Sequence, residues 1–331
     1  MVRALRLLHF GMTPRDIGES RTTIETGAAG FRSITLPFAI FTAIWGSTWI
    51  VIRTQLGVVP PQWSVTYRFT IAAAAMAALA AWKGESLSLG RKGLLAAIFL
   101  GFTQFCVNFN AVYLAERHIT SGVVATVFAL LLIPASLLGW AILGHRPSRR
   151  FAWSSIVAVT GILLLFVHEI RQHPANTNQI LAGIGLTLAG MLGAAIANVV
   201  QAHPEIRRFA LFGLLAWSMA AGALIDGMIA FAMTGPPVFD PRPAYWAGVF
   251  YLALMASVVT FSLYYPVVRK IGPAKAAYSS VLVPIIAMGF STWLEDYRWT
   301  GLTIAGALLA LGGMATALRR DRSGAAVPDA A

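Results

Sequence analysis

Long apolar segments separated by short polar connections run through most of the chain. There are ten of them, and each approaches the ~20 residues that an α-helix needs to cross the hydrocarbon core of a bilayer. Membrane-spanning strands would show shorter segments, of about ten residues, in which apolar and polar positions alternate. We therefore predict ten transmembrane helices, at residues 34–56, 63–82, 93–114, 119–143, 151–168, 180–201, 209–233, 244–268, 273–294 and 299–318.

The composition supports a membrane protein and excludes two other classes. Hydrophobic residues make up 57% of the chain and charged residues only 11%, whereas soluble domains carry about 25% charged residues. A soluble fold would therefore lack the charge to cover its surface. Disordered chains are poor in aromatic and apolar residues, so disorder is excluded as well. The predicted fold class is an all-α integral membrane protein.

Positive charge is distributed very unevenly between the connections. Lys and Arg number 25 against 13 acidic residues, which gives a net charge of +12. Nucleic-acid binding would require these charges on one basic face. They lie instead between apolar segments, so we expect a small-molecule substrate and the lipid bilayer as partners, and no nucleic acid. With the N-terminus inside, 19 of the 25 lie in inner segments and four in outer connections. The positive-inside rule then predicts that both termini are cytoplasmic.

A weak internal repeat relates the two halves of the chain. A shift of 152 residues brings Asn110–Tyr113 over Ser262–Tyr265, and Thr160–Gly161 over Gly312–Gly313. Five helices in each half insert the second half upside down, which is a transporter architecture with the substrate at the repeat interface. An old duplication without a transport role is the alternative. The predicted divisions are a cytoplasmic tail at residues 1–33, five-helix repeats at 34–168 and 179–318, and a second tail at 319–331.

Several short motifs, taken in order, resemble one family of transporters. They are Trp45–Arg53 (WGSTWIVIR) and Tyr67–Phe69 (YRF) in the first half, and Arg269–Ala274 (RKIGPA) in the second. Together, over residues 36–318, they are similar to EamA-type proteins of the drug/metabolite transporter superfamily. The resemblance implies a protein of the bacterial inner (plasma) membrane that exports amino acids and other small metabolites.

The first predicted helix carries a candidate substrate-binding face. Trp45, Trp49 and Arg53 are four residues apart and therefore share one side of the helix. Two indole rings and a cation on one face could hold a flat apolar solute and its carboxylate. The alternative is that the tryptophans pack on a neighbouring helix while Arg53 extends to the lipid headgroups.

Polar side chains inside other helices complete the predicted substrate-binding set. Gln104 and Asn108 share a face of the third helix, Tyr264 follows a Ser and Thr stripe in the eighth, and Tyr278 lies near the start of the ninth. These groups could line a hydrated cavity. Alternatively, the amides could serve only as hydrogen bonds between helices, which are worth about 0.6–2 kcal/mol each.

Two prolines fall inside predicted helices at related places in the halves. Pro134 lies in the fourth helix and Pro284 in the ninth. Each removes a backbone donor and is expected to kink its helix. We predict that both act as hinges during transport, with a static kink filled by packing as the alternative.

The sequence contains no pattern that points to an enzyme, a metal site or a cofactor. A single cysteine, Cys106, cannot form an internal disulfide or a paired-cysteine metal site. His168 and His173 are five residues apart, not four as in a zinc-protease helix, and are expected in an outer connection. No glycine-rich phosphate loop is present, so ATP is not the direct energy source.

Acidic residues are almost absent from the predicted helices. Asp226 is the one acid well inside a predicted span, where it could be a proton site or the partner of an arginine such as Arg242. A pocket without carboxylates favours neutral, zwitterionic or anionic solutes. The resulting hypothesis is an inner-membrane permease that exports small amino-acid-like metabolites, including aromatic ones, by alternating access. The alternative is a membrane-embedded receptor or assembly factor that has the transporter fold but no flux.

Overall fold

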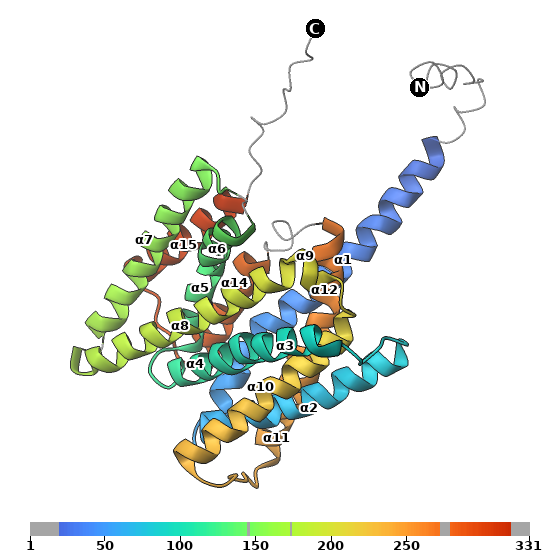
Figure 1. Ribbon diagram of the computed structural model, residues 1–331. Helices are drawn as coiled ribbons and strands as arrows, with labels where there is room; N and C mark the ends of the chain where they lie inside the picture. The colour runs from blue at the N-terminus through green and yellow to red at the C-terminus, as the bar shows by residue number, and fades with distance from the viewer. Residues whose placement is uncertain (1–19, 144–145, 173, 272–278, 319–331) are drawn as a thin grey trace, which may run out of the picture.

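The structure is a computed structural model that describes residues 20–143, 146–172, 174–271 and 279–318. Every regular element within these residues is helical, so the predicted all-α class is confirmed. Figure 1 shows the helices packed into one body, from which the first helix projects. The elements are α1 (Ser20–Thr54), α2 (Pro61–Trp82), α3 (Gly90–Leu100), η2 (Gly101–Val107), α4 (Asn108–Ala115), α5 (Ser121–Phe128), η3 (Ala129–Leu131), α6 (Leu132–Leu143), α7 (Arg149–Gln172), η4 (Pro174–Asn176), α8 (Thr177–Ala202), α9 (Pro204–Arg207), α10 (Leu211–Thr234), α11 (Pro243–Phe250), η5 (Tyr251–Val259), α12 (Thr260–Ile271), α14 (Ser279–Leu294) and α15 (Gly301–Leu318).

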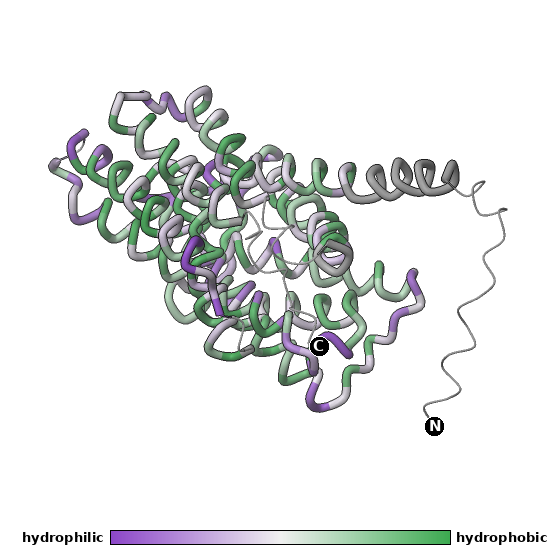
Figure 2. The backbone as a smooth tube through the Cα atoms, turned by 90° about the horizontal axis from the view of Figure 1, so that it is seen from above, coloured by the Kyte–Doolittle hydropathy of each residue, from purple (hydrophilic) through white to green (hydrophobic). Residues whose placement is uncertain are grey.

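Eight helices of the described chain are long and apolar enough to cross a membrane. They are Thr35–Thr54, Pro61–Trp82, Gly90–Ala115, Ser121–Ile142, Arg149–Gln172, Pro174–Ala202, Leu211–Thr234 and Pro243–Val267. Two shorter apolar helices, Val281–Leu294 and Gly301–Ala317, occupy the places of the ninth and tenth predicted spans. Along the chain, hydrophilic residues gather at helix ends and connections (Figure 2).

Two helices extend beyond the predicted apolar segments. Helix α1 begins at Ser20, well before the apolar segment, because hydropathy marks where lipid contact starts and not where helical backbone starts. Helix α7 continues to Gln172, so His168 lies inside a helix and is buried, contrary to the expected loop. Its Nδ1 is 3.2 Å from the hydroxyl oxygen of Thr300.

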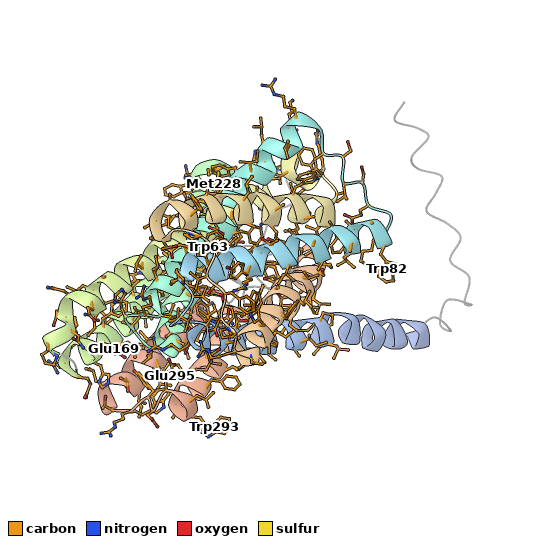
Figure 3. All side chains as sticks on the ribbon, turned by 90° about the horizontal axis from the view of Figure 1, so that it is seen from below. Trp63, Trp82, Glu169, Met228, Trp293 and Glu295 are labelled. Atoms are coloured by element: carbon orange, nitrogen blue, oxygen red, sulfur yellow. The ribbon has the colours of Figure 1, made fainter. Side chains whose placement is uncertain are left out.

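Large apolar side chains cover the outside of the molecule, as lipid contact requires. On α7, Trp153 is 71% exposed, and Ile156 and Leu163 are also exposed, while Gly161 on the same helix is buried. Trp82 and Trp293, at the ends of α2 and α14, point away from the body (Figure 3). Tryptophan is enriched where a membrane meets water, so these two side chains are placed for the interface.

Helices from the two halves of the chain pack in pairs. Helix α2 packs on α10 and α7 on α15, while α1 packs on both α14 and α12, and α8 on both α4 and α6. In Figure 1, α2 lies beside α10 at the lower right and α7 lies beside α15 at the upper left. In each of these pairs one helix comes from the N-terminal half and one from the C-terminal half.

Reciprocal glycine contacts bring α7 and α15 unusually close together. A Cβ atom on Gly161 would lie 2.3 Å from the backbone nitrogen of Ala310, and one on Gly313 would lie 2.6 Å from that of Ala158. Adding 152 to Ala158 and Gly161 gives Ala310 and Gly313, so each contact is the repeat-related copy of the other. A two-fold arrangement produces this reciprocity, because residue i meets residue j and j meets i.

Irregular turns interrupt three spans. The third and eighth spans each contain a π-helix, η2 and η5, which are separated by about the repeat shift. The fourth span breaks into α5 and α6 at the 3₁₀ turn η3, just before Pro134. Proline at this place removes the hydrogen bond to Leu130, which explains the break. Pro284, in contrast, lies inside an unbroken α14.

Candidate functional site

A cavity of about 900 Å³ extends into the protein between helices of both halves. Its mouth is lined by residues of two connections, including the exposed Ser148 and Arg207. Its inner end is lined by Ile52 of α1, Arg68 of α2 and Val112 of α4. The volume is sufficient for a small organic molecule, since ligand pockets measure about 300–1,000 Å³.

Five of the seven predicted substrate-binding residues lie on the wall of this cavity. They are Trp45, Trp49, Gln104, Asn108 and Tyr264. The rings of Trp45 and Tyr264 are 5.0 Å apart and join α1 to α12, and Trp45 Nε1 donates to the backbone oxygen of Ala256 (3.3 Å). The ring of Trp49 lies 5.2 Å from that of Phe128. Each tryptophan therefore packs on a neighbouring helix and also lines the cavity. A packing role and a substrate-binding role are compatible for these two side chains.

The two amide side chains on the wall have unused hydrogen-bonding capacity. Gln104 is 7% exposed and Asn108 is 4% exposed. The side-chain oxygens of both are buried without a hydrogen-bond partner among the described residues. A buried polar atom without a partner costs about 1–3 kcal/mol. A bound ligand that donates hydrogen bonds would satisfy them.

The other predicted residues are placed differently. Arg53 does not line the cavity, because its side chain turns to the carboxylate of Glu295 (Nε–Oε1 3.5 Å) and donates to the backbone oxygen of Glu116. Tyr278 lies outside the described residues. Of the two predicted hinge prolines, Pro284 lines the cavity and Pro134 does not.

Arg68 is the cation on the inner wall, and sequence reasoning did not select it. Its side chain is 1% exposed, its Nε donates to Ser257 Oγ (3.3 Å), and its guanidinium carbon lies 4.3 Å from the ring centre of Phe109. Its Nη1 is buried with no hydrogen-bond partner among the described residues. An arginine within a predicted span was the available signal, because such charges are costly and usually functional.

A polar cluster lies beyond the inner end of the cavity. The carboxylate of Glu295 accepts hydrogen bonds from the hydroxyls of Ser121 (2.5 Å) and Ser291 (2.6 Å), in addition to its ion pair with Arg53. We call Arg53, Ser121, Ser291 and Glu295 the Glu295 cluster. It joins the ends of α1 and α14 to the start of α5. Glu169 of α7 lies close enough to Glu295 for the two carboxylates to repel each other electrostatically (Figure 3).

A second carboxylate is buried between this cluster and the cavity. Glu116 follows α4 directly and is fully buried, and both its carboxylate oxygens have no hydrogen-bond partner among the described residues. Burial raises the pKa of Glu116 well above its ordinary value, the carboxylate of Glu295 raises it further, and Arg53 and Arg68 oppose the rise. Burial therefore disfavours the charged form of Glu116.

Asp226, the acid within a predicted span, does not reach the cavity. Its Oδ1 accepts a hydrogen bond from Asn110 Nδ2 (2.6 Å), which joins α10 to α4. Arg242, the alternative partner, instead forms an ion pair with Asp240. The hydrogen bonds to Arg242 hold the pKa of Asp240 below its ordinary value.

Comparison with known proteins identifies relatives along nearly the whole chain. The family described as "EamA-like transporter family" matches residues 33–167 and again residues 181–319. The "Uncharacterized inner membrane transporter YedA" of Escherichia coli (strain K12) is 28% identical over 260 residues, which is 78% of this chain and 81% of that protein. The "Probable amino-acid metabolite efflux pump" of the same strain is 25% identical over 285 residues, 82% and 90% of the two chains.

One solved structure supports the arrangement of the helices. A chain titled only "Crystal structure of protein" superposes with a TM-score of 0.63 at 18% identity, and the match covers 86% of this chain and 96% of that one. At this identity the likeness shows the fold alone.

Proposed function

The chain belongs to the EamA-like transporter family, and we propose that it is an inner-membrane permease that exports small amino-acid-like metabolites by alternating access. The observation that supports this most directly is the cavity of about 900 Å³, which is lined by exposed residues at its mouth and by buried side chains at its inner end. A site accessible from one side only is one of the two end states of alternating access.

The charge pattern favours a cytoplasmic mouth for the cavity. Arg207 lies at the mouth and Arg208 follows it, while Arg149 and Arg150 begin α7 directly after Ser148 of the mouth. Cytoplasmic connections are the ones enriched in Lys and Arg. The structure then corresponds to the inward-facing state, in which an exporter loads its substrate.

The helix pairing supports two inverted five-helix repeats, at residues 34–168 and 179–318. The family matches the chain twice, at nearly these ranges. The reciprocal contacts of Gly161 and Gly313 fit a two-fold axis through the α7–α15 crossing. In this arrangement the cavity lies at the repeat interface, where transporters of this architecture bind substrate.

The cavity wall favours amino-acid-like solutes with an apolar side chain. Aromatic rings from α1 and α12 and amides from η2 and α4 face the same space, and no Asp or Glu occurs among the described residues that line it. The cations among its described lining residues are Arg68 and Arg207. Such a wall would repel few anions and would not compensate a substrate with net positive charge.

Purified protein in liposomes would test this function by counterflow of labelled L-leucine and L-phenylalanine. We expect saturable, voltage-independent exchange that falls at least about tenfold in Trp49→Ala, because the indole is part of the wall. Trp153→Ala is the matched control, since this tryptophan is exposed on α7; its exchange should equal that of the wild type.

Two outcomes would count against the proposal. Equal losses in the Trp49 and Trp153 variants would show that the cavity is not the pathway. No saturable exchange of these or other small metabolites by well-folded protein would favour the receptor or assembly-factor alternative.

A further inference from the structure

The guanidinium of Arg68 is a buried cation in which one of the two terminal nitrogens lacks a hydrogen-bond partner among the described residues. Arginine presents five N–H donors, yet here Nε reaches Ser257 while Nη1 has no hydrogen-bond partner among the described residues. The ring centres of Phe109 and Phe69 lie 4.3 and 5.1 Å from its Cζ and hold the group in place. This is an oriented, desolvated cation on the wall of an accessible cavity.

Arg68 also lacks a close counter-ion within the described chain. The carboxylate that interacts with it is Glu116, but these two side chains form no ion pair within 4 Å. Burial favours the neutral form of Glu116, which cannot compensate a positive charge. A buried charge without compensation is strongly unfavourable, so the cavity in this state favours an anion next to Arg68.

We propose that Arg68 is the receptor for the carboxylate of the substrate, so that the permease selects amphipathic solutes with a free carboxylate and an apolar body. A planar guanidinium pairs with a carboxylate through two parallel hydrogen bonds. The apolar body then lies against Trp49 and Phe128, whose rings line the same cavity. This inference rests on the proposed function, and it replaces Arg53, whose side chain is held by Glu295.

Matched acid and amide probes test the inference by binding alone, without transport. The probes are 3-phenylpropanoate with 3-phenylpropanamide and 4-methylpentanoate with 4-methylpentanamide, titrated into the purified full-length protein with tryptophan fluorescence as the readout. A hydrogen bond to a charged group contributes about 1.5–3 kcal/mol. We therefore expect the wild type to bind each acid at least about tenfold more tightly than its amide.

Three variants assign the preference to one side chain. Arg68→Gln should bring the ratio of acid to amide affinity close to one. Arg68→Lys retains the charge without the planar guanidinium and should give an intermediate ratio. If the glutamine variant does not fold, the lysine variant alone provides the test. Arg208→Gln removes an exposed cation that is adjacent in sequence to the mouth but does not line the cavity, and it should leave the ratio unchanged.

The result that overturns the inference differs from the one that overturns the proposed function. A wild type that binds neither acid in preference to its amide overturns it, as does a ratio unchanged in both Arg68 variants. An equal loss in Arg208→Gln would show a general electrostatic effect and would overturn it too. If Arg68→Gln exchanges L-leucine in liposomes like the wild type and keeps the acid preference, transport stands and the carboxylate receptor does not.

Discussion

Both the backbone N–H and the hydroxyl of Ser121 donate hydrogen bonds to the carboxylate of Glu295, which lies 174 positions further along the chain. The backbone N–H of Ser121 donates to Glu295 Oε2 (3.2 Å), and its hydroxyl donates to the same oxygen (2.5 Å). Ser121 begins α5, so the carboxylate also meets the positive end of a helix dipole. This contact ties the two halves together beyond the inner end of the cavity.

Removal of the Glu295 carboxylate should open this end of the protein. In Glu295→Ala, the hydroxyls of Ser121 and Ser291 and the guanidinium of Arg53 lose their shared acceptor. A loss of about 1.4 kcal/mol changes a conformational equilibrium tenfold. We expect about tenfold faster labelling of a cysteine placed at Ala125, a buried wall residue, by an impermeant maleimide from the periplasmic side.

The matched control for this experiment is Arg298→Gln. Arg298 is exposed and lies three residues after Glu295, so its loss changes the local charge without breaking a contact of the cluster. Its labelling rate should equal that of the parent protein. Unchanged labelling in Glu295→Ala would show that the cluster does not hold the outer end closed.

A methyl group at Gly313 should destabilise the fold, whereas one at the adjacent Gly312 should not. In Gly313→Ala the new Cβ would lie 2.6 Å from the backbone nitrogen of Ala158, and backbone cannot move aside as a flexible side chain can. A Cβ at Gly312 meets no atom within 4 Å. We expect Gly313→Ala to lose about 1–3 kcal/mol and Gly312→Ala to be neutral or slightly stabilised by its higher helix propensity.

Thermal unfolding in detergent would measure this difference as a lower Tm for Gly313→Ala only. Because the two substitutions add the same atoms to adjacent positions of α15, effects on helix propensity cancel in the comparison. Equal Tm values would contradict the close α7–α15 crossing.

Helical periodicity was sufficient to predict most of the cavity wall. Trp45 and Trp49, and likewise Gln104 and Asn108, are four residues apart, and a helix places such pairs on one face whatever surrounds it. The sequence therefore predicted two helix faces that belong to the cavity wall. The sequence could not predict which helices pack against these faces, because the pairing of α1 with α12 and α14 depends on tertiary packing.

The two arginines within spans show where sequence reasoning fails. Arg53 shares the face of Trp49, yet it lies one turn further on, where the side chain meets Glu295. The place of Arg68 on the wall arises from the packing of α2 against η5, where Ser257 accepts its hydrogen bond. Contacts between residues almost 190 positions apart leave no local pattern.

Binding of a carboxylate probe should weaken as the pH rises. Burial raises the pKa of Glu116, so at low pH this side chain is neutral and Arg68 is free to pair with the probe. As the pH rises through this raised pKa, Glu116 ionises and competes for Arg68. The groups that face Glu116 are Arg53 from α1, Arg68 from α2, Tyr113 on α4 and Glu295 after α14.

A titration of 3-phenylpropanoate at several pH values would measure this competition. The dissociation constant of the wild type should increase with pH, whereas Glu116→Gln should remain tight throughout, because glutamine cannot acquire a negative charge. The amide probe provides the control and should show no pH dependence in either protein. A parallel increase in wild type and Glu116→Gln would assign the titration to another group.

The amide of Gln104 should contribute to recognition of substrates that donate hydrogen bonds. Gln104 lines the cavity and its Oε1 is buried without a hydrogen-bond partner among the described residues, whereas the adjacent hydroxyl of Thr103 already donates to the backbone oxygen of Phe99 (2.9 Å). Gln104→Leu removes the acceptor at similar size, so KM for exchange of the L-leucine probe should rise by about tenfold, the value of one hydrogen bond of about 1.4 kcal/mol. Thr103→Val should change KM less than about twofold, since its hydroxyl is satisfied within its own helix. If both variants raise KM equally, the effect arises from the packing of η2 and not from contact with substrate.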